Sequence, residues 1–180
     1  MPSPDFNVSK NHFQLFGLAQ SCQLDTAQLE LAFRALQAQV HPDKSAHLAD
    51  FEQRLAMQRS TLVNEAYQTL RSPIRRARYL LSLHGVDTQE ETNTAMPVDF
   101  LMAQMEWREA VAEAAQARDI SALGQLEVRM KHERRELEAQ LVVKMDAEHD
   151  YAAAAGLVRK LRFMEKLAEE IDSAYDEIDN

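Results

Sequence analysis

Apolar side chains recur at every third or fourth position along most of this chain, and no other feature limits the possible folds as much. Leu29, Phe33 and Leu36 follow this spacing in the first half, as Phe100 and Trp107 do in the second. Residues spaced in this way lie on one face of an α-helix. Only 4 glycines and 5 prolines occur among 180 residues, which leaves little room for a sheet with tight turns. The sequence therefore predicts an all-α protein.

Capping residues and helix breakers predict two helices before residue 41. Ser9 is placed to cap a short helix that Gly17 ends, and Asp25 or Thr26 is placed to cap a longer one. The proline two residues beyond Val40 disfavours helical geometry at the residue before it. We therefore expect the longer helix to end near Val40.

Two further helices are expected between residues 50 and 85. A periodic run from Phe51 to Leu70 predicts a helix that packs antiparallel against the one before it. Ser72 as the cap, Pro73 as the first helical residue and Gly85 just beyond the end delimit the other helix. The first half therefore contains four predicted helices.

The second half predicts a separate three-helix bundle. Residues 86–96 are polar and acidic and have no periodicity, which is typical of a linker. Three long helical patterns follow, at about 97–117, 119–147 and 149–178, and the short breaks between them favour antiparallel packing. The expected divisions are an extension at 1–10, a first domain at 11–85, a linker at 86–96 and the bundle at 97–180.

The charge and cysteine content exclude several classes of protein. The net charge is −9, of which residues 86–180 carry −11 and residues 1–85 carry +2, so a nucleic-acid partner is not expected. The single cysteine, Cys22, has no partner for a disulfide or a thiolate metal site. No apolar run is long enough to cross a membrane, and the N-terminus has no signal-peptide pattern. The sequence predicts a cytoplasmic protein without a metal or cofactor.

A loop of unusual composition separates the second and third predicted helices. His41, Pro42, Asp43 and Lys44 follow one another there, and they are a catalytic cluster, an ordinary turn or a tip that another protein contacts. No serine or cysteine has the sequence context of a nucleophile, and no glycine-rich phosphate loop occurs. The tip of a small helical hairpin also provides no polar pocket. We therefore expect no catalysis by this loop.

The first helix of the bundle has apolar residues on two opposite sides. Leu101, Met102 and Met105 lie opposite its core face, in line with three glutamates. In the last helix, Phe163 falls off the apolar stripe, among charged residues. These side chains either cover the first domain or the neighbouring helix, or form an exposed apolar patch with an acidic rim, which is typical of a protein-binding site.

The order of the elements in the first half resembles the J-domain of DnaJ-type co-chaperones, over about residues 11–84. The resemblance rests on the short FQLFGL element, the helix that ends in HPDK and the later string NEAYQTLRSPIRRARYLL. It implies docking onto a DnaK-type chaperone ATPase, whose ATP hydrolysis the loop triggers. The chaperone-binding residues that it implies are His41, Pro42, Asp43, Lys44 and Arg34.

The helix before this loop departs from the J-domain pattern in its charge. J-domains carry several lysines or arginines on this helix, whereas here only Arg34 is present. Electrostatic steering from this helix should therefore be weak, which favours a specialised chaperone partner. Arg75, Arg76 and Arg78 either supply part of the missing charge or form a solvated basic face.

The second half extends the resemblance to the HscB-type co-chaperones of iron–sulfur cluster assembly. The segments DFLMAQMEWREAVAE and AAAAGLVRKLRFMEKL carry this resemblance. It implies a three-helix bundle that binds the scaffold protein IscU and delivers it to the chaperone HscA. The positions that match the scaffold-binding residues of the family are Leu101, Met102, Met105, Glu106, Glu109, Glu113 and Phe163. A J-protein for a different client and a helical adaptor without any effect on an ATPase remain the alternatives.

Overall fold

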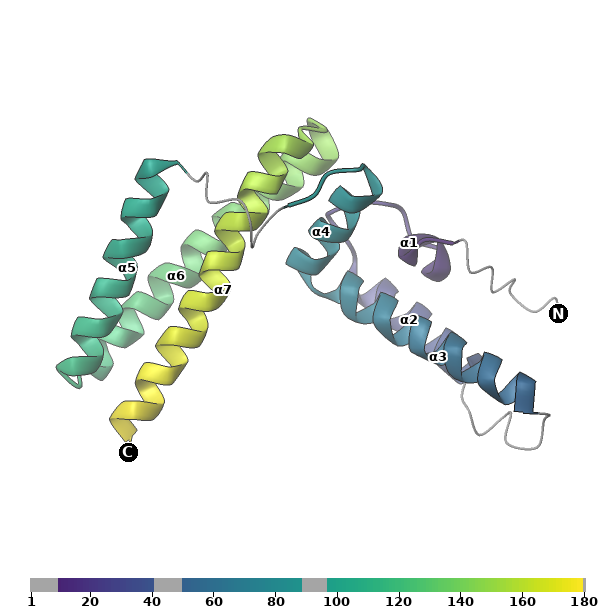
Figure 1. The fold of residues 1–180 in the computed structure, drawn as a ribbon, viewed down its shortest axis with the longest axis horizontal. Coiled ribbons are helices and arrows are strands. Elements are labelled where there is room, and N and C mark those ends of the chain that lie inside the picture. The colour runs from purple at the N-terminus through teal and green to yellow at the C-terminus, as the bar shows by residue number, and fades with distance from the viewer. Residues whose placement is uncertain (1–9, 41–49, 89–96, 180) are drawn as a thin grey trace. The chain divides into compact units, whose positions relative to one another are not determined.

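The computed structural model describes residues 10–40, 50–88 and 97–179, and every regular element in these ranges is helical (Figure 1). The elements are α1 (His12–Phe16), α2 (Thr26–Val40), α3 (Asp50–Arg71), α4 (Pro73–Leu83), α5 (Val98–Gln116), α6 (Ile120–Val142), the π-helical turn η2 (Val143–Ala147) and α7 (Tyr151–Asp179). The chain divides into two compact units, Met1–Leu80 and Leu81–Asn180. The all-α prediction is confirmed.

The short helix α1 is held at both ends by local hydrogen bonds. The Asn11 side chain accepts a hydrogen bond from the backbone N–H of Gln14, whose own side chain accepts one from the N–H of Asn11. This reciprocal arrangement is a capping box, so the prediction of Ser9 as the cap is wrong. Gly17 ends the helix with φ 67°, a left-handed conformation that glycine adopts without strain.

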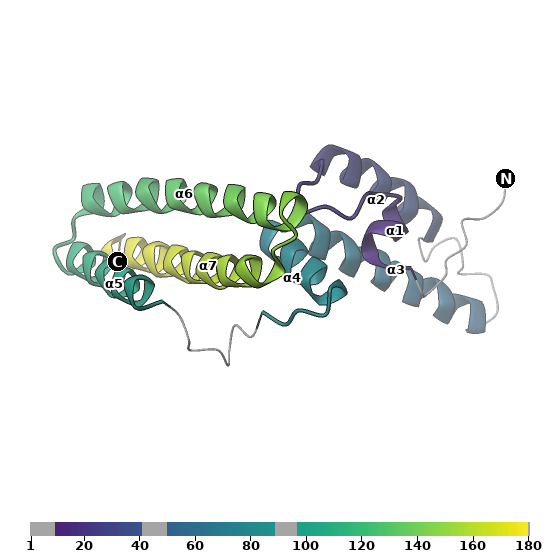
Figure 2. The same cartoon turned by 90° about the horizontal axis from the view of Figure 1, so that it is seen from above.

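Helices α2 and α3 form the antiparallel pair of the first unit, and both views show them side by side (Figures 1 and 2). Asp25 caps α2, because its Oδ1 accepts from the backbone N–H of Ala27 at 2.9 Å. Phe33 and Tyr67 stack across the pair with ring centroids 4.0 Å apart. Phe51, which was expected on the buried stripe, is 71 % exposed. The reason is length: α3 has 22 residues and α2 has 15, so α3 extends beyond α2, and among the described helices none lies beside its first turn (Figures 1 and 2).

Helix α4 begins and ends as its sequence predicts, but one of its arginines is buried. The Ser72 hydroxyl accepts from the N–H of Arg75 at 3.3 Å, and Gly85 has φ 72° beyond the last turn. The Arg76 side chain donates from Nε to the Cys22 carbonyl at 2.8 Å and from Nη1 to the Leu70 carbonyl at 2.6 Å. The expectation that this arginine belongs to a solvated basic face is therefore wrong, whereas Arg75 is exposed.

The second unit is a three-helix bundle in which α5, α6 and α7 pack against one another (Figure 2). Asp119 caps α6 by accepting from the N–H of Ala122 at 2.9 Å, and Asp150 caps α7 by accepting from Ala153 at 3.0 Å. The largest fully buried side chains of this unit include Leu123, Leu141, Leu161, Met164, Leu167 and Ile171. In the parts that the structure describes, no helix is both long enough and apolar enough to cross a membrane.

Candidate partner-binding surface

Helix α5 has a buried face and an exposed apolar face. Phe100, Trp107 and Val111 are 3–7 % exposed and face the bundle, as the sequence predicted. On the other side, Leu101 is 41 %, Met102 57 % and Met105 71 % exposed. Neither α6 nor α7 covers these three side chains, so they do not pack against a neighbouring helix of the bundle.

The exposed face extends one turn further than the sequence predicted. Val98 is 71 % exposed, and it precedes Leu101, Met102 and Met105 by three, four and seven residues. These intervals place all four side chains on one face of α5, and we call these four residues the α5 patch. The sequence contained this spacing, but Val98 is the first residue of α5, where a single apolar side chain gives little information about its exposure.

Three carboxylates continue the α5 patch toward the C-terminus of the helix. Glu106, Glu109 and Glu113 are all exposed. Glu109 follows Met105 by four residues and Glu113 follows Glu109 by four, so the apolar face becomes an acidic one along the same side of α5. A basic partner surface would complement this charge.

Phe163 does not lie on the exposed charged face where it was expected. The side chain is only 6 % exposed, and the ring meets that of Phe100 edge to face with centroids 5.7 Å apart. The Arg108 guanidinium lies over the same ring at 5.7 Å and bonds to the Glu170 carboxylate at 3.2 Å. The correction has a simple cause: α7 packs against both α5 and α6, so its buried arc is wider than the single stripe that periodicity identifies.

The residues of the first unit that match the J-domain pattern are only partly described. The loop residues His41, Pro42, Asp43 and Lys44 lie outside the described ranges. Arg34 is exposed on α2 and pairs with Glu30 one turn earlier, so part of its charge is neutralised within the helix. Leu31, on the same helix, is 69 % exposed and was not singled out from the sequence.

Metal-ligating side chains do not gather in the described parts of the chain. Across residues 10–40, 50–88 and 97–179, no three His, Cys, Asp or Glu residues are placed to hold a metal ion. Cys22 is buried in the first unit, at 2 % exposure.

Models of two protein families match the chain over most of its length. The DnaJ domain model matches residues 11–79, and the model named HSCB C-terminal oligomerisation domain matches residues 96–172. The first match covers α1 to α3 and most of α4. The second covers α5, α6 and most of α7.

Whole-chain comparisons give the same result. The chain is 50 % identical to the co-chaperone protein HscB homolog of Aromatoleum aromaticum, over 96 % of this chain and 98 % of the relative. The HscB homolog of Chromobacterium violaceum is 53 % identical over 97 % of both chains. The structure of chaperone HscB from Vibrio cholerae is similar with a TM-score of 0.86, at 40 % identity over 92 % of this chain and 98 % of that one. The chain therefore belongs to the HscB family of co-chaperones, with a J-domain followed by an HscB C-terminal domain.

Proposed function

We propose that this protein binds an IscU-type iron–sulfur scaffold and delivers it to an HscA-like chaperone ATPase. The J-domain stimulates ATP hydrolysis by the chaperone, while the C-terminal bundle holds the scaffold. Two binding modules on one chain raise the local concentration of scaffold near the chaperone. The protein acts in the cytoplasm and catalyses no reaction of its own.

The α5 patch is the observation that carries this proposal. Its side chains are 41–71 % exposed although a helix needs only one apolar face to pack, and exposed apolar clusters with polar rims are typical of protein-binding sites. Methionine suits such a surface because it is flexible and polarizable. Glu106, Glu109 and Glu113 form the acidic rim, and Phe163 supports the surface from beneath through its contact with Phe100.

On the chaperone side, the proposed contact residues are His41, Pro42, Asp43 and Lys44, together with Arg34. Two lines of support exist, the match of residues 11–79 to the DnaJ domain and the position of the loop directly after α2. Because Arg34 already pairs with Glu30, charge on α2 contributes little to steering the chaperone.

Alanine substitution of Met105 tests the scaffold half of the proposal. Met105→Ala should weaken binding of a purified IscU-type scaffold by about 2 kcal/mol, or roughly 30-fold, as expected for the centre of an interface. Val128→Ala is the matched control, because Val128 is an equally exposed apolar residue on α6, at 69 %. Calorimetry gives both affinities, and circular dichroism verifies that each variant is folded. Equal affinities would move the client site away from α5 and favour a different client.

Substitution of His41 tests the chaperone half. His41→Gln should abolish stimulation of the HscA-like ATPase while scaffold affinity and melting temperature stay unchanged, because a surface contact residue contributes within about ±0.5 kcal/mol to folding. The steady-state ATPase rate with and without scaffold is the measurement. Undiminished stimulation would instead support a helical adaptor that does not act through this loop.

A further inference from the structure

A groove runs between α5 and the C-terminal half of α7, within the second unit. It is an open depression of the surface with a volume of about 570 Å³. Its floor consists of small or buried side chains, among them Val111, Ala115 and Ala174. Because these side chains are short, the backbone of an extended segment can approach the two helices closely.

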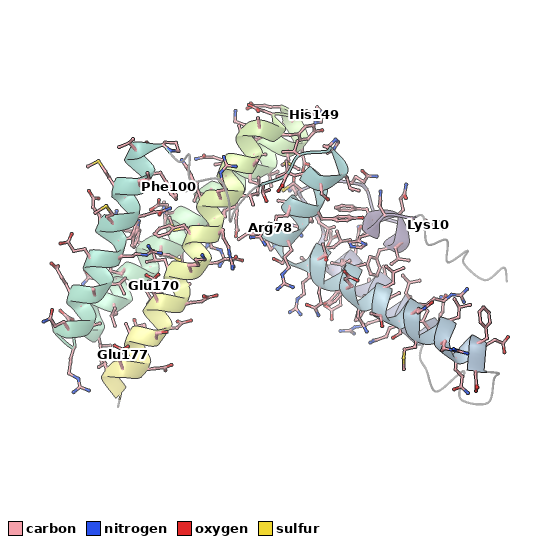
Figure 3. All side chains as sticks on the ribbon, in the orientation of Figure 1. Lys10, Arg78, Phe100, His149, Glu170 and Glu177 are labelled. Carbon is pink, nitrogen blue, oxygen red and sulfur yellow. The ribbon has the colours of Figure 1, made fainter. Side chains whose placement is uncertain are left out.

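Both helices that form the groove are acidic. Residues 165–179 of α7 contain seven Asp or Glu and one Lys, and residues 98–116 of α5 contain four Asp or Glu and one Arg. Glu170 and Glu177, labelled in Figure 3, both line the groove on the α7 side. Arg108 and Lys166 also line the groove, and Arg108 pairs with Glu170. Glu169 and Glu177 are therefore the carboxylates that a segment with lysine or arginine side chains would complement.

Carboxylates also stand at the C-terminal end of α7. The negative end of the helix dipole lies at the C-terminus, where cations stabilise a helix and anions destabilise it. Yet the last turns of α7 carry Asp176, Glu177 and Asp179 and no basic residue. The Arg118 guanidinium donates to the Ile178 carbonyl at 2.7 Å in this turn, and Glu177 is the carboxylate among these three that lines the groove.

The groove begins where the α5 patch ends. Arg108 lines the groove and follows Met105 by three residues and Leu101 by seven, so the three share a side of α5. The same guanidinium lies over Phe163 and bonds to Glu170, which also lines the groove. The patch and the groove thus form one continuous surface.

We propose that the groove between α5 and α7 takes an extended, lysine- or arginine-bearing segment of the same scaffold protein that the α5 patch binds. The basic side chains pair with Glu169 and Glu177, and the small residues of the floor admit the backbone. This inference rests on the proposed function, because it places a second part of the same client beside the first. It enlarges the client site from one helix face to two helices.

A steric block tests the groove separately from the patch. Ala112 lines the groove and is exposed, so Ala112→Trp fills the groove without entering the core. Ala139→Trp places the same side chain on an exposed position of α6 and is the control. Calorimetry with an IscU-type scaffold and full-length protein should show at least tenfold weaker binding for the first variant and less than twofold change for the second.

A charge test does not depend on that bulky substitution being tolerated. The double variant Glu169→Gln/Glu177→Gln removes two carboxylates that line the groove. The control variant, Asp172→Asn/Asp176→Asn, removes two carboxylates from the same stretch of α7 that do not line the groove. Both double variants reduce the unfavourable interaction of carboxylates with the helix dipole to a similar extent. The groove variant should lose about fivefold or more in affinity and show a shallower salt dependence than the control.

The outcomes separate the groove from the function on which it rests. If Met105→Ala weakens scaffold binding while Ala112→Trp and Glu169→Gln/Glu177→Gln bind like wild type, the groove proposal is overturned and the proposed function stands. If Met105→Ala also binds like wild type, the proposed function fails first. A change in oligomeric state with Ala112→Trp, measured by light scattering at unchanged scaffold affinity, would assign the groove to a second copy and overturn the proposal as well.

Discussion

At the scale of single residues, a buried arginine joins distant segments of the first unit. Arg76 is 7 % exposed, and its guanidinium donates to the carbonyls of Cys22 and Leu70. Leu70 lies in the last turn of α3, where carbonyls have no partner within the helix. The side chain therefore completes the end of α3 and holds the segment between α1 and α2 in place.

Removal of this guanidinium should destabilise the first unit substantially. Arg76→Leu keeps the apolar stem but withdraws hydrogen bonds from two carbonyls in a buried setting, and we expect a loss of about 2–4 kcal/mol in the free energy of unfolding. Urea denaturation followed by circular dichroism measures it. Arg75→Leu, one residue away on the exposed side of α4, should change stability by less than about 0.5 kcal/mol. Similar effects at both positions would show that the buried hydrogen bonds contribute little.

The sequence predicted the role of a residue correctly where that role depends on contacts with residues close by in the chain. Gly17, Asp25, Ser72 and Gly85 act through backbone groups within four residues, and each was identified from its own neighbourhood. The burial of Arg76 depends on carbonyls 6 and 54 residues away, which no local pattern encodes. The same rule applies to the candidate site. The exposure of the methionines on α5 could be predicted, because it follows from the period of one helix.

At the scale of elements, a single apolar stripe does not identify every buried residue of a helix. Phe163 was assigned to the surface because it departs from the main stripe of α7, yet it is buried against Phe100. A helix with two packing partners has two overlapping buried faces, and periodicity identifies only the stronger one. Phe51 shows the opposite error, since it continues the stripe of α3 beyond the end of the partner helix.

A glycine inside α6 offers a test of how much the low helix propensity of one residue reduces the stability of the bundle. Gly124 lies in the second turn of α6, inside the helix, where glycine costs about 0.5–1 kcal/mol relative to alanine. A Cβ added there would meet only the Tyr175 hydroxyl at 3.6 Å, an ordinary van der Waals distance. Gly124→Ala should therefore raise the unfolding free energy by that amount in denaturant titrations.

The contrasting variant is at the end of α4. Gly85 has φ 72°, a conformation that strains any residue with a Cβ, so Gly85→Ala should lower stability although nothing lies within 4 Å of the added atom. If Gly124→Ala also lowered stability, the space beside Tyr175 would be smaller than the geometry indicates.

At the scale of the whole molecule, the division into two units falls within α4 and assigns its last turn and the residues after it to the second unit. Residues 81–88 belong to the second unit. Within that unit, the His84 ring stacks on Tyr151 with centroids 4.1 Å apart, and Arg159 Nη1 donates to the Thr88 carbonyl at 3.0 Å. The boundary between residues 85 and 86 that the sequence predicts divides the first of these contacts, since His84 lies before it and Tyr151 after it, and the boundary stays a prediction.

Two fragments of the second unit test how much residues 81–96 contribute to its stability. The fragment 97–180 should fold alone as a helical bundle, because the core of α5, α6 and α7 lies within it. The fragment 81–180 should be more stable by about 1 kcal/mol, since it adds a stacked ring pair and a hydrogen bond. Thermal melts followed by circular dichroism compare the two. An unfolded 97–180 fragment would show that the bundle depends on residues outside it.

The exposed methionines of the α5 patch also have a chemical consequence. Met102 and Met105 are 57 % and 71 % exposed, whereas Met130, Met145 and Met164 are buried to 4 % or less. Peroxide converts accessible methionines to sulfoxides, which are polar, and methionine sulfoxide reductases reverse the change. Under oxidative stress these two thioethers, and that of Met57 on α3 at 65 % exposure, would react before the buried ones, and the α5 patch would become hydrophilic while the core methionines of the bundle stayed reduced. If the α5 patch holds the client as proposed, peroxide would weaken client binding and a methionine sulfoxide reductase would restore it.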